Sequence, residues 1–298
     1  MNTLEQQRFN KNFIRNFKLP IAVDKEPYFT YFLNLLNPYF DTVRKYEIFK
    51  KVYQKYGEGL FKHNSQKLNE TLQYLSAKPE YQAFTKMDMS RFNKKLNIKS
   101  KDLYVTGNEG KRYISIDLVK ANFQSFMFIM PEIFDGFKDF NSFAKSRDFN
   151  EVLLESKISR QVIFGGLSAA RQQQVQKYMM EQIILSVFDK GVKEEDIYSL
   201  SSDEVFFEDK NYDIEEIQKL ASDLGYQVRV EKFDLVKPFE KAYFVKEGVN
   251  GSREFKMVPT SVMAEFIKKY EGKPLEDMDL YFYDENKRLS KFMEEGVF

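Results

Sequence analysis

Two stretches decide the fold of this chain: Tyr113-Ile-Ser-Ile-Asp117-Leu-Val119 and Ile197-Tyr-Ser-Leu-Ser-Ser-Asp203-Glu204-Val-Phe-Phe207. Their apolar and alternating patterns predict β-strands, and each stretch carries a carboxylate at an end of its apolar run. If the two strands lie side by side, Asp117 and Asp203 can hold two divalent cations roughly 4 Å apart. The pattern therefore indicates phosphoryl-transfer chemistry.

The composition excludes several other kinds of site. With 298 residues, 43% of them apolar, the chain can bury a large core in one large or two modest domains. The absence of cysteine excludes disulfides, thiolate zinc sites and cysteine nucleophiles, and the single histidine, His63, disfavours a histidine metal cage or a catalytic triad. We expect His63 to be a surface residue. Hard metal ions with oxygen ligands remain as candidates.

No membrane or secretion signal is expected from the pattern. The segment from Met1 to Lys18 is polar and mixed, and no uncharged apolar run approaches the length of about 18 residues that a membrane helix needs. We therefore predict a protein without a membrane partner, located in the cytoplasm.

The net charge of +1 conceals an asymmetry. Residues 1–100 carry 18 Lys plus Arg against 9 Asp plus Glu, whereas residues 101–298 carry 28 against 36. A basic part beside an acidic one suits a protein whose first part contacts phosphates and whose second part holds metal ions. Solvated faces of lysine-rich helices explain the same counts, so both interpretations stay open.

The remaining pattern predicts a helical lobe followed by a mixed region. From Thr3 to about Lys99, aromatic and apolar residues recur at spacings of three and four, and we interpret these stripes as core rather than as base-stacking platforms. Strands are predicted at 111–118, 196–208, 226–233, 241–246 and 253–258, and helical regions at 119–130, 140–190, 212–224 and 260–270. This order predicts an α+β fold with a mainly antiparallel sheet.

Four motifs, taken in order, resemble those of a known family. The first three are Ser115-Ile-Asp117-Leu-Val-Lys-Ala-Asn122-Phe123, Arg160-x-x-x-Phe164-Gly165 and Ser202-Asp203-Glu204-Val-Phe-Phe-Glu208. They resemble the palm and fingers motifs of template-dependent DNA and RNA polymerases of families A and B. The fourth, Lys237-Pro-Phe-Glu-Lys241-Ala-Tyr243-Phe-Val-Lys246, is similar to the lysine-tyrosine strand of family B. The resemblance covers about residues 110–250.

The resemblance implies a DNA polymerase-like nucleotidyltransferase that binds a nucleic-acid template and primer and nucleoside triphosphates. It implies that Asp117 and Asp203 ligate two Mg²⁺ or Mn²⁺ ions, with Glu204 as an additional catalytic carboxylate. The substrate-binding residues that it implies are Arg160 toward the triphosphate, Phe164 toward the base or sugar, Asn122 and Phe123 near the sugar, and Lys241. Lys157 and Arg171 are weaker candidates for phosphate contacts.

The resemblance also implies a division of the chain. Residues 1–100 would form a basic helical lobe that holds template or primer, and residues 101–298 a polymerase-like palm with a fingers-like helical insertion at about 140–190. A chain of this length leaves no room for a usual proofreading domain, which suits a minimal or viral enzyme.

Three serines depart from the family patterns and keep two alternatives open. Ser202 stands where family A has histidine, Ser168 where tyrosine is usual, and Ser156 where a second basic residue is usual. One alternative is a catalytically degenerate palm that binds nucleic acid or another protein. The other is a metal-dependent nuclease that uses the same two carboxylates.

Overall fold

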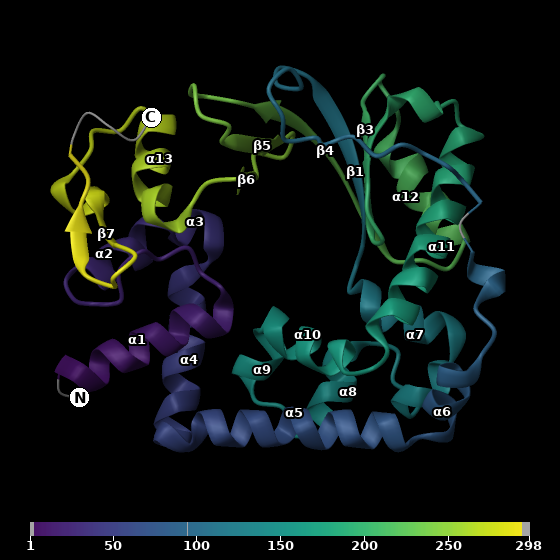
Figure 1. Cartoon of the computed structure of the whole chain (residues 1–298), viewed down its shortest axis with the longest axis horizontal. Helices are drawn as coiled ribbons and strands as arrows, with labels where there is room; N and C mark the ends of the chain where they lie inside the picture. The colour runs from purple at the N-terminus through teal and green to yellow at the C-terminus, as the bar shows by residue number, and fades with distance from the viewer. Residues whose placement is uncertain (1–2, 94, 294–298) are drawn as a thin grey trace.

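A computed structural model describes residues 3–93 and 95–293 of the chain. It is an α+β protein with an antiparallel six-stranded sheet, which confirms the predicted fold class. In Figure 1 the elements follow one another around a ring, with the sheet at the top, a long helix along the bottom, and both termini on the left. Among the described residues, no helix is both long enough and apolar enough to cross a membrane.

The first part of the chain is helical. Its α-helices are α1 Thr3–Phe17, α2 Tyr28–Leu35, α3 Asn37–Phe40, α4 Thr42–Tyr56, α5 Leu60–Ala77 and α6 Pro79–Lys86, with short 3-10 turns at Gly57–Gly59 and Ser90–Phe92. The aromatic stripes lie in the interior, since Phe9, Phe13 and Phe49 are almost completely buried and their rings contact one another edge-on or tilted. Their spacing places them on one face of each helix, which supports the core interpretation over stacking platforms.

The sheet runs in the order β2-β3-β1-β4-β5-β6, and all its neighbours are antiparallel. Its strands are β1 Arg112–Leu118, β2 Ile197–Leu200, β3 Glu204–Glu208, β4 Val228–Val236, β5 Phe244–Gly248 and β6 Arg253–Lys256. Because successive side chains alternate between faces, Ile114, Ile116 and Leu118 of β1 point to one face and Ser115 and Asp117 to the other.

One face of the sheet is covered by helices. The apolar residues of β1, β3 and β4 pack there against α11 Ala169–Phe188 and α12 Ile214–Asp223. On the opposite face, Asp117 lies opposite Glu204 on β3 and Arg229 on β4. The helices therefore cover one face of the sheet and leave Asp117, Glu204 and Arg229 on the other.

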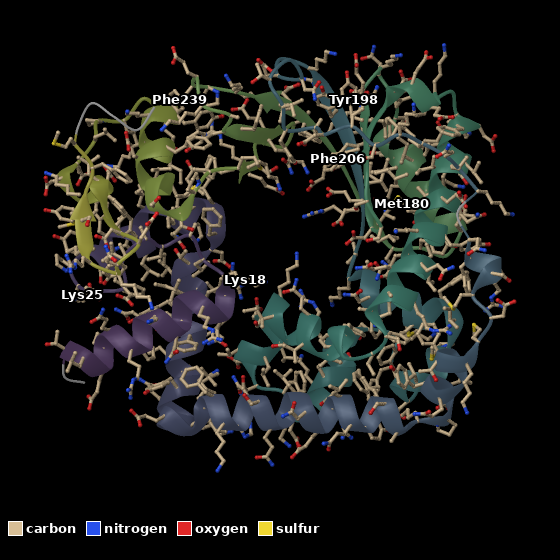
Figure 2. All side chains as sticks on the ribbon, in the orientation of Figure 1. Lys18, Lys25, Met180, Tyr198, Phe206 and Phe239 are labelled. Carbon is tan, nitrogen blue, oxygen red and sulfur yellow. The ribbon has the colours of Figure 1, made fainter. Side chains whose placement is uncertain are left out.

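The helical segment between β1 and β2 packs against the helices of residues 1–100, which we call the first lobe. It contains α7 Ala121–Ile129, α8 Phe140–Ser146, α9 Glu151–Glu155, α10 Lys157–Gly165 and α11, with 3-10 turns at Pro131–Phe134 and Glu194–Asp196. A phenylalanine-rich core joins it to α5 and α6, as Phe126 and Phe164 pack with Leu75 and Phe84. Lys18 at the end of α1 also donates to Gln161 Oε1 of α10 at 2.8 Å, and Figure 2 labels Lys18 on the inner side of the ring.

The chain returns to its beginning at the C-terminal end. A 3-10 turn at Thr260–Val262, α13 Met263–Tyr270, a turn at Asp277–Leu280 and the hairpin of β7 Tyr281–Tyr283 and β8 Leu289–Lys291 pack beside α2. Met263 and Ile267 belong to the same core as Phe13 and Phe29, and the Tyr31 hydroxyl donates to Asp279 at 2.7 Å. The hydrophobic cores thus connect residues on both sides of position 100, and the division into two domains stays a prediction.

The strand predicted at 196–208 is wrong as a single element. The chain folds there into two strands, β2 and β3, joined by the turn Ser201–Asp203. The Ser201 hydroxyl accepts hydrogen bonds from the N–H groups of Asp203 and Glu204 at 3.3 and 3.0 Å. A serine hydroxyl that bonds nearby backbone in this way favours a turn over a continuous ladder.

Candidate active site

The β2–β3 turn brings Asp203 to the end of β1. The N–H of Leu118 donates to the carbonyl of Asp203 at 2.8 Å, and Asp117 is the register partner of Glu204. Since Asp117 and Glu204 share a sheet face, their side chains are direct cross-strand neighbours. Three carboxylates that are distant in the sequence therefore meet at one end of the central strand pair.

A pocket of about 350 Å³ opens beside these carboxylates. Asp117 and Asp203 contribute to its lining from the sheet, and Lys157, Arg160 and Gln161 from α10. The start of α7 completes it with Lys120, Ala121, Asn122 and Phe123, together with Leu118 and Phe164. Positions 157, 160, 161 and 164 share one helical face, which is why α10 presents them together.

Burial and nearby negative charge raise the pKa of two carboxylates at this end of the sheet, Asp117 and Glu204. Burial raises the pKa of Asp117; Arg229 opposes this effect, and the nearby Asp203 adds to it. Burial and the neighbouring Asp117 raise the pKa of Glu204 to about 7. Crowded negative charge with incomplete solvation is relieved when a proton or a cation binds.

The cations on the other side of the pocket show the converse effect. Burial lowers the pKa of Lys120, and the positive charge of Arg160 lowers it further. Burial also lowers the pKa of Arg160, against a smaller opposing effect of Glu155. Two partly desolvated cations beside each other are stabilised when an anion binds between them.

No protein-family model, curated protein or solved structure matches this chain. The chemistry of the pocket therefore has to be inferred from its own side chains.

Several predicted site residues lie together in the pocket and others do not. Asp117, Asp203, Arg160, Lys157 and Asn122 all line it, although they come from four separate elements or turns. Glu204 lies next to Asp117 on the sheet. Asn122 is held in place, because its Oδ1 accepts from Nε2 of the buried Gln176 at 2.6 Å.

The two predicted aromatic contacts need correction. Phe164 is 1% exposed and its ring packs against Phe126 and Phe140, so no face is available for an incoming base. Phe123 is likewise buried, with its ring 4.5 Å from that of Phe134. Both rings form the apolar wall of the pocket, because a phenylalanine-rich core lies directly behind it.

The basic candidates Lys241 and Arg171 also lie elsewhere. Lys241 is exposed in the irregular segment between β4 and β5, outside the residues that line the pocket. Arg171 donates to the carbonyl of Met87 at 2.9 Å and lies over the ring of Phe84, which makes it a link between α11 and the first lobe.

Sequence reasoning missed three charged residues at the site: Lys120, Arg229 and Lys246. Arg229 Nη2 lies 3.3 Å from Asp117 Oδ2, and its Nε lies 3.6 Å from Glu231. Lys246 is 4% exposed and donates to Glu231 at 2.9 Å and to the Ser115 hydroxyl at 3.2 Å. The alternation Arg229-x-Glu231 in a predicted strand was a signal for charges on one sheet face.

The donor set at Asp117 and Asp203 fits a hard divalent cation, which prefers carboxylate oxygens. Within residues 3–93 and 95–293, no three His, Asp or Glu side chains are grouped as a metal site. A cation here would complete its shell with water and substrate phosphates, as Mg²⁺ commonly does with one or two protein carboxylates.

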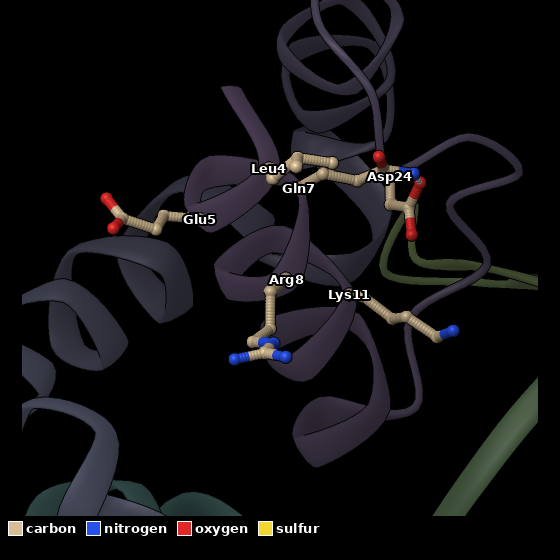
Figure 3. Close-up of a pocket in the computed structure, with 6 residues that line it drawn as sticks. All are labelled: Leu4, Glu5, Gln7, Arg8, Lys11 and Asp24. Carbon is tan, nitrogen blue, oxygen red and sulfur yellow. Dashed lines mark hydrogen bonds between the residues drawn. The ribbon is translucent and has the colours of Figure 1, made fainter. Parts of the chain in front are cut away.

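A second hollow, of about 450 Å³, lies against α1 and is drawn in Figure 3. Its walls include Arg8, Lys11 and Asp24, but the Asp24 carboxylate already accepts from Gln7 at 2.9 Å and from the Tyr283 hydroxyl at 2.6 Å. These bonds fasten the C-terminal hairpin to α1 and indicate a structural role for Asp24.

Proposed function

We propose that this protein is a nucleotidyltransferase that adds nucleotides to the 3′ end of a nucleic-acid strand, with a polymerase-like palm. The observation that carries the proposal is one pocket with the carboxylates of Asp117 and Asp203 on one side and Lys157 and Arg160 on the other. In phosphoryl transfer, negative charge develops on the phosphoryl oxygens, and metal ions and cationic side chains stabilise it together. Carboxylates are needed to hold the metal ions, so the reaction uses both kinds of side chain.

Each side of the pocket has its own role in this proposal. Asp117 and Asp203 would hold Mg²⁺ or Mn²⁺, which when bound supplies the charge that activates a 3′-hydroxyl and neutralises a leaving pyrophosphate. Arg160 offers a planar fork of donors for phosphate oxygens, and Lys157 and Lys120 add point charges beside it. Asn122, in the first turn of α7, lines the same pocket and would contact the sugar of a bound nucleotide.

The arrangement of the elements supports a palm and fingers. The sheet with its helical backing carries the carboxylates, and α10 from the helical segment carries the cations. The helices of residues 1–100 pack against that segment through α5 and α6. The excess of basic residues in this part of the chain would hold a template or primer.

Extension of a labelled primer on a template, with Mg²⁺ or Mn²⁺ and either nucleotide set, tests the proposal. We expect extension by the wild type and none by Asp117→Asn or Asp203→Asn, because each change removes a metal ligand but little volume. Asp223→Asn, an exposed change on α12, is the matched control and should extend like the wild type. Wild-type-like extension by Asp203→Asn would overturn the assignment of the site.

One observation favours a second candidate, a palm that binds nucleic acid without catalysis. Arg229 Nη2 forms an ion pair with Asp117 Oδ2 at 3.3 Å and would compete with a metal ion for this carboxylate. If this second candidate is correct, the wild type should bind an oligonucleotide with a steep salt dependence and should not extend a primer. Shortening of the labelled strand in the same assay would indicate a nuclease instead.

A further inference from the structure

A third pocket, also charged, lies outside the candidate active site, where α4, the start of α5 and α9 meet, with Lys145 contributed by α8. It has a volume of about 760 Å³, within the range of ligand-binding pockets. The three helices contact one another directly or through the loop before α9, and Figure 1 shows α9 close to α4 and α5. None of the residues that line this pocket lines the one beside Asp117.

Positive charge predominates on its rim. Lys51, Lys55, Lys67 and Lys145 line the pocket, against two carboxylates, Asp148 and Glu151. Glu151 lies 3.2 Å from Lys51, and Asp148 lies 3.5 Å from Lys67. The carboxylates thus pair with two of the lysines, and the rim keeps an excess of positive charge for a further anion.

The wall of the pocket combines an aromatic stack with an unsatisfied polar atom. The His63 imidazole stacks on the Tyr56 ring at 4.4 Å between centroids, and Lys55 Nζ lies 5.1 Å from the Tyr56 ring centre. His63 is partly buried rather than the surface residue that the sequence suggested, and its Nε2 is buried with no hydrogen-bond partner among the described residues. A buried nitrogen left without a partner costs free energy.

The floor is apolar and held in place. Val52 and Phe149 are buried beneath the rim. Asn150 caps α9 by accepting from the N–H of Leu153 at 3.1 Å, and its amide donates to Asn64 of α5 at 2.7 Å. A fixed apolar floor under a cationic rim matches a ligand with both an apolar ring and phosphates.

We propose that this pocket binds the phosphate backbone and a base of a single-stranded nucleic acid. The choice of ligand rests on the proposed function, and it agrees with the basic charge of residues 1–100. The strand would contact the protein here in addition to the pocket at Asp117, so this site holds the strand rather than the reacting nucleotide. Single-strand binding commonly combines lysine contacts to phosphates with apolar or aromatic contacts to bases.

Salt-dependent binding of a labelled single-stranded oligonucleotide tests the proposal. Loss of one phosphate contact lowers the slope of log K against log salt by about 0.7, so Lys55→Gln/Lys145→Gln should lower it by about 1.4 and weaken binding roughly tenfold at low salt. Lys273→Gln/Lys287→Gln removes the same charge from exposed positions near the C-terminal hairpin, outside the pocket and outside the basic first part of the chain, and should leave the slope unchanged.

A second readout locates the ligand. His63 is the only histidine in the chain, so the NMR signal of its imidazole needs no assignment. We expect the oligonucleotide to shift this signal in the wild type and in Asp203→Asn, and to shift it less in Lys55→Gln/Lys145→Gln at equal concentration. Inorganic phosphate alone is the comparison, and an equal shift with phosphate would show a site for free anions rather than for a strand.

The outcomes separate this proposal from the proposed function. Equal loss of binding in both lysine pairs, no loss in either, or an unmoved His63 signal would overturn it. So would a wild type that binds an acidic peptide at this pocket but no oligonucleotide. If the wild type extends no primer but the pocket variant alone loses strand binding, the pocket is supported and the catalytic proposal fails.

Discussion

Replacement of Glu204 by glutamine should remove a pH dependence from the stability of the metal-free protein. Burial and the Asp117 carboxylate raise the pKa of Glu204 from 4.5 to about 7, so the folded protein binds a proton there that the unfolded chain has already released. Stability contributed by the protonated group is therefore complete below about pH 4.5 and is lost as the pH rises toward 7.

The size of the effect follows from the shift. A difference of roughly 2.5 pH units at 1.36 kcal/mol each sets an upper limit of about 3.4 kcal/mol. Glu204 is only partly buried, and solvent screening and relaxation reduce this to about 2 kcal/mol. We expect Glu204→Gln to match the wild type near pH 4.5 and to be about 2 kcal/mol more stable at pH 8.

Urea unfolding between pH 4.5 and 8, with a metal chelator present, measures how the free energy of unfolding changes with pH in the wild type and in Glu204→Gln. Glu208→Gln makes the same change at the other end of β3 and should keep the wild-type slope. Asp117→Asn removes the neighbouring carboxylate and should weaken the slope without abolishing it, because burial is the larger cause. If Glu204→Gln loses stability with rising pH as steeply as the wild type, the reasoning about this carboxylate is refuted.

Three further predictions concern the charged residues around the site. Arg229→Gln should strengthen Mn²⁺ binding in a titration, because it frees the Asp117 carboxylate; weaker binding would show that Arg229 organises the site. Lys246→Met should destabilise the protein by about 2 kcal/mol in urea unfolding, since it leaves Glu231 without its 2.9 Å partner, and adding Glu231→Gln should recover most of the loss. Lys120→Met should weaken nucleoside triphosphate binding about tenfold by calorimetry with little change in stability, because its charge is already poorly solvated; unchanged affinity would contradict its role.

Local patterns in the sequence predicted the elements that carry the site. Alternation around Asp117 predicted β1, and the spacing of Arg160 and Phe164, four residues apart, predicted that they share one face of a helix, which is α10. These inferences succeed because side-chain direction follows from the period of a strand or helix alone. The same reasoning misjudged Phe164, since the period tells which side a residue faces but not whether another helix covers that side.

Sequence by itself determined the α+β class, the antiparallel tendency, the exclusion of thiol chemistry, and the order of acidic and basic motifs along the chain. Only the tertiary structure decided that Asp203 lies in a turn beside Asp117, that Arg229 reaches the same carboxylate, and that Lys120 joins Arg160. The physical reason is that propensity and periodicity act over a few residues, whereas pairing register and packing bring together groups far apart in the chain. The charges that define this pocket's chemistry meet only through such contacts.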